Sequence, residues 1–123
     1  MERKTTPPRD LVVVMAGDRS LHGKITQRRK YDLWVIYYGD SDAVAAEYEA
    51  KADRFWRRKG LKIELIRRVL LEEVYFGEGF DFSQYRYVFM TDDDILFENG
   101  AEDVHALIAT AEQIGADVFQ PAV

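Results

Sequence analysis

The stretch YRYVFMTDDDILF, residues 85–97, joins an apolar run to three consecutive aspartates. The run is rich in aromatic and β-branched residues, which favour a strand buried in a sheet. Three adjacent carboxylates repel one another, and burying them without partners is costly, so they should stand where the strand leaves the core. The stretch therefore predicts a buried strand whose carboxyl end is acidic.

Other apolar runs of similar length occur along the chain. They are short and nearly continuous, which is typical of strands that are covered on both faces. The segments are DLVVVMAG (10–17), YDLWVIYYGD (31–40), a shorter edge strand in DRFWRR (53–58), and a final strand in ADVFQPAV (116–123) that is cut short at Pro121.

Helical patterns lie between these runs. Residues 20–30 have the length of one short helix, and residues 42–52 favour another with Asp42 as its N-cap. Residues 60–76 form the clearest amphipathic segment. Its apolar side chains recur at three- and four-residue spacing: Ile63, Ile66, Val69, Leu70 and Val74.

A second strong helix is predicted over residues 101–114. Asn99 followed by Glu102 resembles a capping box, and Gly115 is a typical helix stop. The apolar stripe of this helix consists of Val104, Leu107, Ile108 and Ala111.

Strands that alternate with amphipathic helices predict an α/β fold, namely a Rossmann-like three-layer sandwich around a mostly parallel sheet. The 123 residues, 47% of them hydrophobic, suit a single domain over residues 10–123 behind a mobile polar leader, residues 1–9. Ligands of such sheets bind beyond the carboxyl ends of the strands. AGD, YGD and TDDD all fall at such ends.

Composition narrows the range of functions. The formal charge of −5 and the pI of about 5.0 argue against a nucleic-acid partner. The chain has no cysteine, which excludes disulfides, zinc–thiolate sites and cysteine nucleophiles. No apolar run has the length of a membrane span, and the N-terminus lacks the apolar segment of a signal peptide, so we expect a soluble, by default cytoplasmic chain.

The acidic triplet is the first candidate site. In extended geometry Asp92 and Asp94 point to one side of the strand and Asp93 to the other. Two carboxylates on one side suit a hard divalent cation, Mg²⁺ or Mn²⁺, that takes its remaining oxygens from water and from phosphates. The alternative is a solvated turn that caps the next element, and the position at a buried strand end favours the cation.

Three further residues stand at predicted strand or helix ends. Asp18 and Asp40 either cap turns or accept hydrogen bonds from a ribose hydroxyl or a base N–H, and their spacing leaves both interpretations open. Lys62 begins the strong helix, where it either meets a phosphate or is an ordinary surface lysine.

Five ordered segments together resemble a family of uncharacterised glycosyltransferase-like domains: DLVVVMAGDRSLH, YDLWVIYYGD, KGLKIELIRRVL, YRYVFMTDDDI and FQPAV. The resemblance extends from Asp10 to the last residue. The arrangement of the segments is similar to the GT-A nucleotide-sugar transferase fold. It implies a strand order that begins 3-2-1-4, with a fifth strand near the C-terminus.

The resemblance also implies roles for single residues. The triplet matches an Asp-x-Asp motif, in which Asp92 lies nearer the ribose and Asp94 is the main ligand of a Mn²⁺ or Mg²⁺ ion. That ion would bridge the diphosphate of a nucleoside-diphosphate sugar. The other implied positions are Ala16, Gly17 and Asp18 lining the nucleotide pocket, Asp40 near the base, and Lys62 near the nucleotide or diphosphate.

GT-A domains usually continue into an acceptor-binding half, whereas this chain stops after the fifth predicted strand. No catalytic residue is therefore assigned, and we expect donor binding rather than complete catalytic machinery. Two alternatives stay open. One is a non-catalytic α/β module that assembles through an exposed sheet edge, and the other is a different Mg²⁺-dependent, phosphate-handling enzyme whose key carboxylate would be Asp18.

Overall fold

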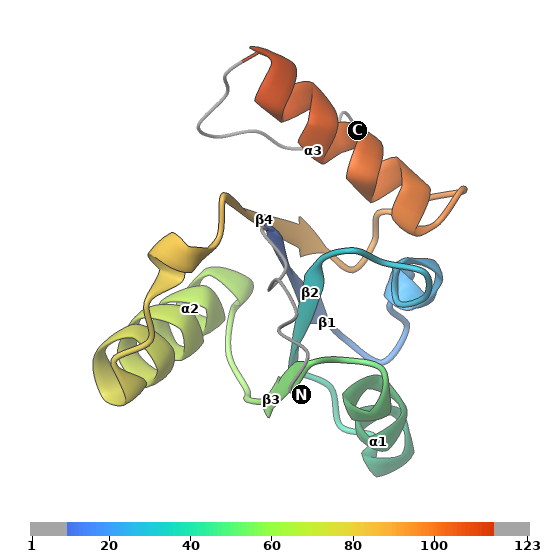
Figure 1. Ribbon diagram of the computed structural model, residues 1–123. Coiled ribbons are helices and arrows are strands. Elements are labelled where there is room, and N and C mark those ends of the chain that lie inside the picture. The colour runs from blue at the N-terminus through green and yellow to red at the C-terminus, as the bar shows by residue number, and fades with distance from the viewer. Residues whose placement is uncertain (1–9, 115–123) are drawn as a thin grey trace, which may run out of the picture.

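A computed structural model of the chain describes residues 10–114. Four strands form one sheet, in which every neighbouring pair is parallel and the order is β3-β2-β1-β4 (Figure 1). This confirms the predicted α/β fold class and the order 3-2-1-4. The leader and the fifth predicted strand lie outside the described residues. The strands are β1 (Asp10–Ala16), β2 (Asp32–Tyr37), β3 (Arg54–Arg57) and β4 (Tyr87–Asp92).

Strand β1 lies at the centre of the sheet. It pairs with β2 on one side and with β4 on the other, so that Val13 stands opposite both Trp34 and Met90. Every residue of β1 from Leu11 onward is buried. A strand that is covered on both faces can use apolar side chains at each position, which explains the unbroken run VVVMA.

Helices cover both faces of the sheet (Figure 1). The short 3₁₀ helix η1 (His22–Ile25) and α3 (Ala101–Ile114) pack on one face, with Tyr48 and Ala52 of the α1 (Asp42–Ala50) region beside them. The opposite face packs against α2 (Lys62–Ile66) and its continuation η2 (Arg67–Gly77). The molecule therefore has the three layers that the alternating pattern predicts.

Two of the predicted helices differ in detail. The helix expected over residues 20–30 is only η1, because the chain turns at its end: Thr26 Oγ1 donates to the Gly23 carbonyl at 2.7 Å, and Arg28 adopts a φ of 56°. The N-cap of α1 is Ser41 rather than Asp42. Its side chain accepts from the Val44 N–H at 3.2 Å, and Asp42 is the first helical residue.

The helix over residues 62–77 buries most of the predicted stripe: Val69 and Val74 are fully buried, and Ile66 and Leu70 are partly buried against the same core. The prediction is wrong at Ile63, which is 76% exposed, and it missed Leu65, which is fully buried. From Arg67 onward the helix is a π-helix, whose turns hold more residues than those of an α-helix. The five-residue step from Val69 to Val74 lies within these wider turns.

Helix α3 has the predicted bounds, and Val104, Ile108 and Ala111 of its stripe are buried. Its N-terminal contact uses Asp103 instead of Glu102. The Asp103 carboxylate accepts from the backbone N–H of Asn99 at 3.0 Å and from its side-chain amide at 3.1 Å. The predicted stop at Gly115 lies outside the described residues. Within residues 10–114, no helix combines the length and the apolar character needed to cross a membrane.

Candidate functional site at the carboxyl edge of the sheet

The turn after β4 is tied directly to the end of β1. The Gly17 backbone N–H donates to Asp93 Oδ2 at 2.8 Å, and the Leu21 N–H donates to the Asp93 carbonyl, also at 2.8 Å. These two strands are parallel neighbours, so their carboxyl ends emerge at the same edge. The predicted convergence of AGD and TDDD is therefore present in the fold.

Asp93 holds this corner together. Besides the Gly17 N–H, its carboxylate accepts from the Tyr38 hydroxyl at 3.0 Å and lies 3.3 Å from Lys62 Nζ. Burial alone would raise the pKa of Asp93, but the N–H of Gly17, the Tyr38 hydroxyl and the Lys62 charge outweigh it and hold that pKa below its ordinary value. Asp93 is thus a charged structural residue, with a side chain only 14% exposed.

Lys62 brings its charge from the first turn of α2 to the same corner. Its Nζ lies 3.4 Å from Asp92 Oδ1 and 3.3 Å from Asp93 Oδ1, and it stands 5.9 Å from the centre of the Tyr38 ring. Burial opposes the charged form of Lys62, but the attraction of Asp93, Tyr38 and Asp92 is stronger and raises its pKa. A permanent positive charge therefore stands at the acidic strand end.

The three aspartates do not simply alternate as in an extended strand. Asp92 and Asp93 converge on the same lysine, because β4 ends at Asp92 and the chain turns immediately afterwards. The Asp92 side chain remains 51% exposed, and Asp94 is an exposed residue in the turn. Asp92 and Asp94 thus remain accessible, whereas Asp93 is used to build the corner.

Asp18 connects the end of β1 with the loop after β2. Its carboxylate accepts from the Tyr37 hydroxyl and from the backbone N–H groups of Asp40 at 3.3 Å and Ser41 at 3.4 Å. The Tyr37 hydrogen bond, followed by the Asp40 N–H, lowers the pKa of Asp18. A Cβ at Gly39 would collide with the side chains of Asp18 and Tyr37, so the glycine permits their close approach to the loop.

Asp40 itself faces solvent. Its carboxylate forms an ion pair with Lys59, and its backbone carbonyl accepts from Arg57 at 3.1 Å. Lys59 Nζ also donates to the Tyr38 carbonyl at 2.9 Å. Two lysines, Lys59 and Lys62, therefore flank the loop after β2.

A polar cluster that the sequence does not reveal supports the backbone after β1. The Tyr48 hydroxyl donates to the Gly17 carbonyl at 3.0 Å and accepts from the Ser20 N–H at 3.2 Å. The Ser20 side chain contacts Nδ1 of the buried His22, whose pKa burial lowers to about 4. Tyr38 and Tyr48 are neighbours of the candidate site that the sequence did not single out. For Tyr38, the doubled tyrosine in YYGD was the only signal, since alternation along a strand sends one of the two side chains to each face.

The donor set at this edge fits a hard cation only in part. No group of three or more acidic or histidine side chains among residues 10–114 is arranged to hold a metal ion. Asp92 and Asp94 offer two carboxylates, which matches a Mg²⁺ or Mn²⁺ ion that keeps waters and takes phosphate oxygens. The oxygen chemistry is thus compatible with such an ion, provided that a ligand completes the coordination.

Comparison of the chain with protein-family models, with curated proteins and with solved structures found no match. The class of this protein is consequently defined by its own fold and site. It is a parallel α/β protein of Rossmann-like type with an acidic, lysine-bridged edge at the carboxyl ends of β1, β2 and β4.

Proposed function

We propose that this chain is a metal-dependent, nucleotide-sugar-binding domain of glycosyltransferase type. The observation that carries the proposal is the meeting of Gly17, Lys62 and the acidic triplet at one edge of the sheet, joined through Asp93. In parallel α/β sheets this edge is where ligands bind. The five-segment resemblance to glycosyltransferase-like domains supports the same reading.

Each part of the donor has a counterpart at this edge. Asp92 and Asp94 would hold Mn²⁺ or Mg²⁺, and Lys62 would meet the diphosphate. The nucleotide would lie against Asp18, which is exposed, with Asp40 toward the base. Ala16 and Gly17 are buried and would support this end of β1 from within. A bound cation would neutralise the charge that develops on the departing nucleoside diphosphate. The proposal covers donor binding, and we assign no general base.

Calorimetry with the 123-residue chain tests this proposal. Mn²⁺ is titrated in the presence and absence of UDP- and GDP-sugars, and we expect saturable nucleotide-sugar binding that requires the metal. Asp94→Asn should abolish this metal-dependent binding of the nucleotide-sugar. Glu98→Gln makes the same change of charge at another exposed carboxylate and should leave binding intact. Binding that is absent, or that is indifferent to Asp94→Asn, would refute the proposal.

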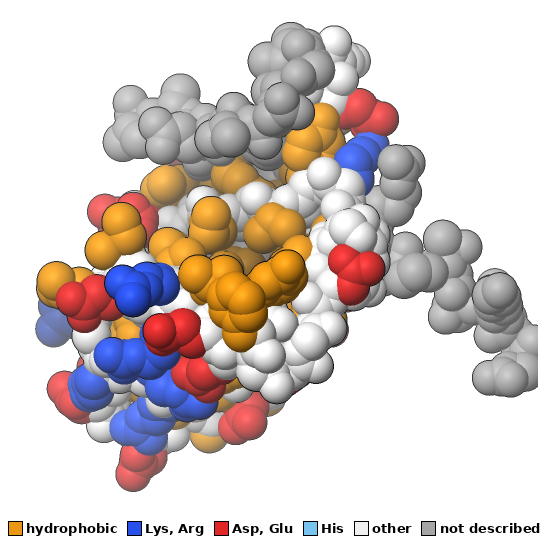
Figure 2. Space-filling model, turned by 90° about the vertical axis from the view of Figure 1, so that its left-hand side faces the viewer, with side chains coloured by type: hydrophobic (Ala, Val, Ile, Leu, Met, Phe, Trp, Pro, Cys, Tyr) orange, Lys and Arg blue, Asp and Glu red, His pale blue; other side chains and the backbone are white. Residues whose placement is uncertain are grey.

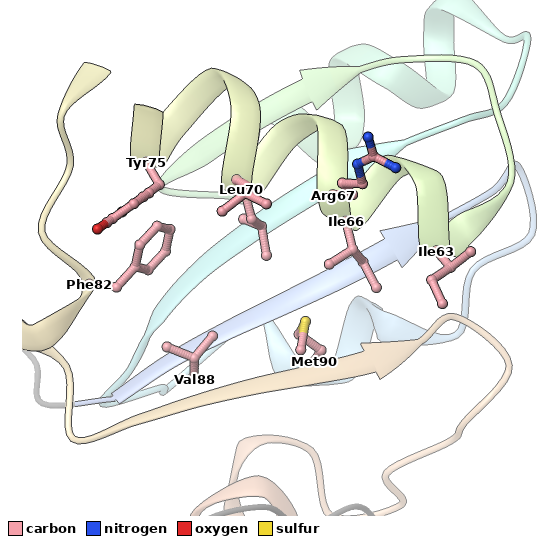
Figure 3. Close-up of a pocket in the computed structure, with 9 residues that line it drawn as sticks. Ile63, Ile66, Arg67, Leu70, Tyr75, Phe82, Val88 and Met90 are labelled. Atoms are coloured by element: carbon pink, nitrogen blue, oxygen red, sulfur yellow. The ribbon is translucent and has the colours of Figure 1, made fainter. Parts of the chain in front are cut away.

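A second candidate function is assembly with another copy of the chain, and an apolar groove favours it. The groove has a volume of about 540 Å³ and lies between the helix over residues 62–77 and β4 (Figure 3). Hydrophobic side chains gather on this face of the molecule (Figure 2). The lining residues are Ile63, Ile66, Arg67, Leu70, Leu71, Tyr75, Phe82, Val88 and Met90.

Exposed apolar patches of this kind commonly mark interfaces. Val88 and Met90 come from a strand at the end of the described sheet, and both are exposed. Light scattering after gel filtration tests the assembly function. An assembly module should be a dimer that Met90→Glu converts to a monomer, whereas Leu96→Glu, at an exposed leucine outside the groove, should leave the dimer unchanged. A wild-type monomer at high concentration would exclude this candidate.

A further inference from the structure

The ammonium group of Lys62 occupies the space between two carboxylates of the acidic triplet. Its Nζ lies 3.4 Å from Asp92 Oδ1 and 3.3 Å from Asp93 Oδ1, and the lysine side chain is still 39% exposed. Asp93 has other partners, namely the Gly17 N–H and the Tyr38 hydroxyl. For Asp92, Lys62 is the only partner among the ion pairs of the described residues.

This arrangement gives Lys62 two separable relationships. Its contact with Asp93 is anchored in the corner, because Asp93 is fixed by backbone and tyrosine hydrogen bonds. Its contact with Asp92 involves a half-exposed carboxylate at the strand terminus, and exposed ion pairs are weak and readily exchanged. The lysine can therefore release Asp92 by rotating its flexible stem while keeping its position on α2.

We propose that Lys62 is a tethered counter-cation that holds the Asp92 carboxylate until a divalent cation replaces it, and that the freed ammonium then meets the diphosphate of the nucleotide. This inference rests on the proposed function and adds its regulation. Two positive charges cannot share Asp92 without repulsion, so lysine and metal compete. The diphosphate carries negative charge that accepts the displaced ammonium, which removes the competition.

The proposal makes the binding of metal and nucleotide cooperative. Without nucleotide, a divalent cation has to displace Lys62 from Asp92 and then faces a nearby ammonium that keeps only Asp93 as its carboxylate partner. With a nucleoside diphosphate present, the same ammonium contributes to phosphate binding. Lys62 therefore weakens binding of the metal alone and strengthens binding of the metal with the nucleotide, and by linkage each ligand raises the affinity of the other.

The test measures free Mn²⁺ by electron paramagnetic resonance during titration of the full chain, first alone and then with UDP. Without UDP, Lys62→Met should bind Mn²⁺ roughly three- to tenfold more tightly than the wild type, the range expected for the loss of one or two exposed ion pairs. Adding UDP should raise the Mn²⁺ affinity of the wild type clearly more than that of Lys62→Met. Lys62→Arg, which keeps the charge, should behave like the wild type.

Lys51→Met is the matched control, because Lys51 is an exposed lysine paired with Glu47 on α1 and its loss changes the net charge equally. If Lys62→Met and Lys51→Met change the Mn²⁺ affinity alike, the effect is general electrostatics and the counter-cation role is wrong, although the proposed function stands. If UDP increases Mn²⁺ affinity equally in the wild type and in Lys62→Met, the phosphate contact is wrong. If neither protein binds Mn²⁺ with or without UDP, the proposed function fails and this inference fails with it.

Discussion

Gly17 donates its backbone N–H to the Asp93 carboxylate at 2.8 Å, so a single hydrogen bond links the end of β1 to the turn that follows β4. The two residues are separated by 76 positions in the chain. The bond holds the Asp93 side chain at the corner, while Asp92 and Asp94 on either side of it are exposed. A structural aspartate thus stands between two aspartates that are available for binding.

We expect Asp93→Ala to lower the free energy of unfolding by about 2 kcal/mol, because the Gly17 N–H and the Tyr38 hydroxyl lose their acceptor. Asp94→Ala removes an exposed carboxylate and should change stability by less than about 0.5 kcal/mol. Urea unfolding at pH 7, followed by circular dichroism, measures both values. Equal effects of the two substitutions would show that Asp93 does not hold the corner.

The lowered pKa of Asp93 predicts a loss of stability in acid. A carboxyl whose pKa is lower in the folded than in the unfolded chain stabilises the fold above the unfolded value, about 3.9, and loses that contribution as pH falls through the folded value. The stability advantage of the wild type over Asp93→Asn should therefore be constant near pH 6 and shrink as the pH is lowered below about 5. Unfolding curves at a series of pH values provide the comparison, and a difference that is independent of pH would contradict it.

His22 should destabilise the fold in a different pH window. Burial lowers its pKa from 6.5 to about 4, so the unfolded chain takes up a proton between these values while the folded chain does not. Stability should therefore decrease as pH falls from 6.5 to 4, by up to about 3 kcal/mol. Nitrogen chemical shifts of the imidazole should show a neutral His22 ring at pH 5.5, and His22→Gln should flatten the pH dependence in this window. A ring that is half protonated near pH 6.5 would refute the prediction.

Gly100 and Gly23 provide a matched pair of glycine substitutions. Gly100 adopts a φ of 64°, and a Cβ there would stand 2.6 Å from the Lys24 carbonyl oxygen, whereas a Cβ at Gly23 would meet nothing within 4 Å. Gly100→Ala should therefore cost at least about 1 kcal/mol of unfolding free energy, and Gly23→Ala about 0.5 kcal/mol or less in either direction. Thermal unfolding of the two variants measures the contrast. Similar melting temperatures would mean that the packing of Gly100 on η1 contributes little.

Most of the architecture could be predicted because it depends on local patterns. The continuous apolar run of β1 requires burial on both faces, and the alternation of strands and helices then favours a parallel sheet. The bounds of α3 follow from the periodicity of its apolar residues. Prediction was poorer at Ile63 and Leu65 of α2: the pattern placed Ile63 in the core, whereas the structure buries Leu65 and leaves Ile63 exposed. The rotation of this short helix against the sheet is set by tertiary packing and not by local spacing.

The candidate site shows the same division. The sequence predicts which residues stand at strand ends, because each of them comes directly after an apolar run: Gly17, Asp18, Asp40 and the acidic triplet. No spacing in the sequence predicts the contacts between these ends. Tyr38 and Lys62 both reach Asp93, and Tyr37 reaches Asp18. These contacts join segments that only the sheet order β3-β2-β1-β4 and the crossover through α2 bring together.

The sequence by itself determined that an apolar strand ends in three carboxylates. The expected burial of that strand holds on one face only, because Phe89 and Thr91 are buried whereas Val88 and Met90 are exposed. The tertiary structure alone decided how those carboxylates divide their roles. Asp93 turns toward Gly17, Tyr38 and Lys62 because hydrogen bonds and an ion pair compensate its partial burial. Asp92 and Asp94 stay exposed, where solvent stabilises their charge and a ligand can reach them.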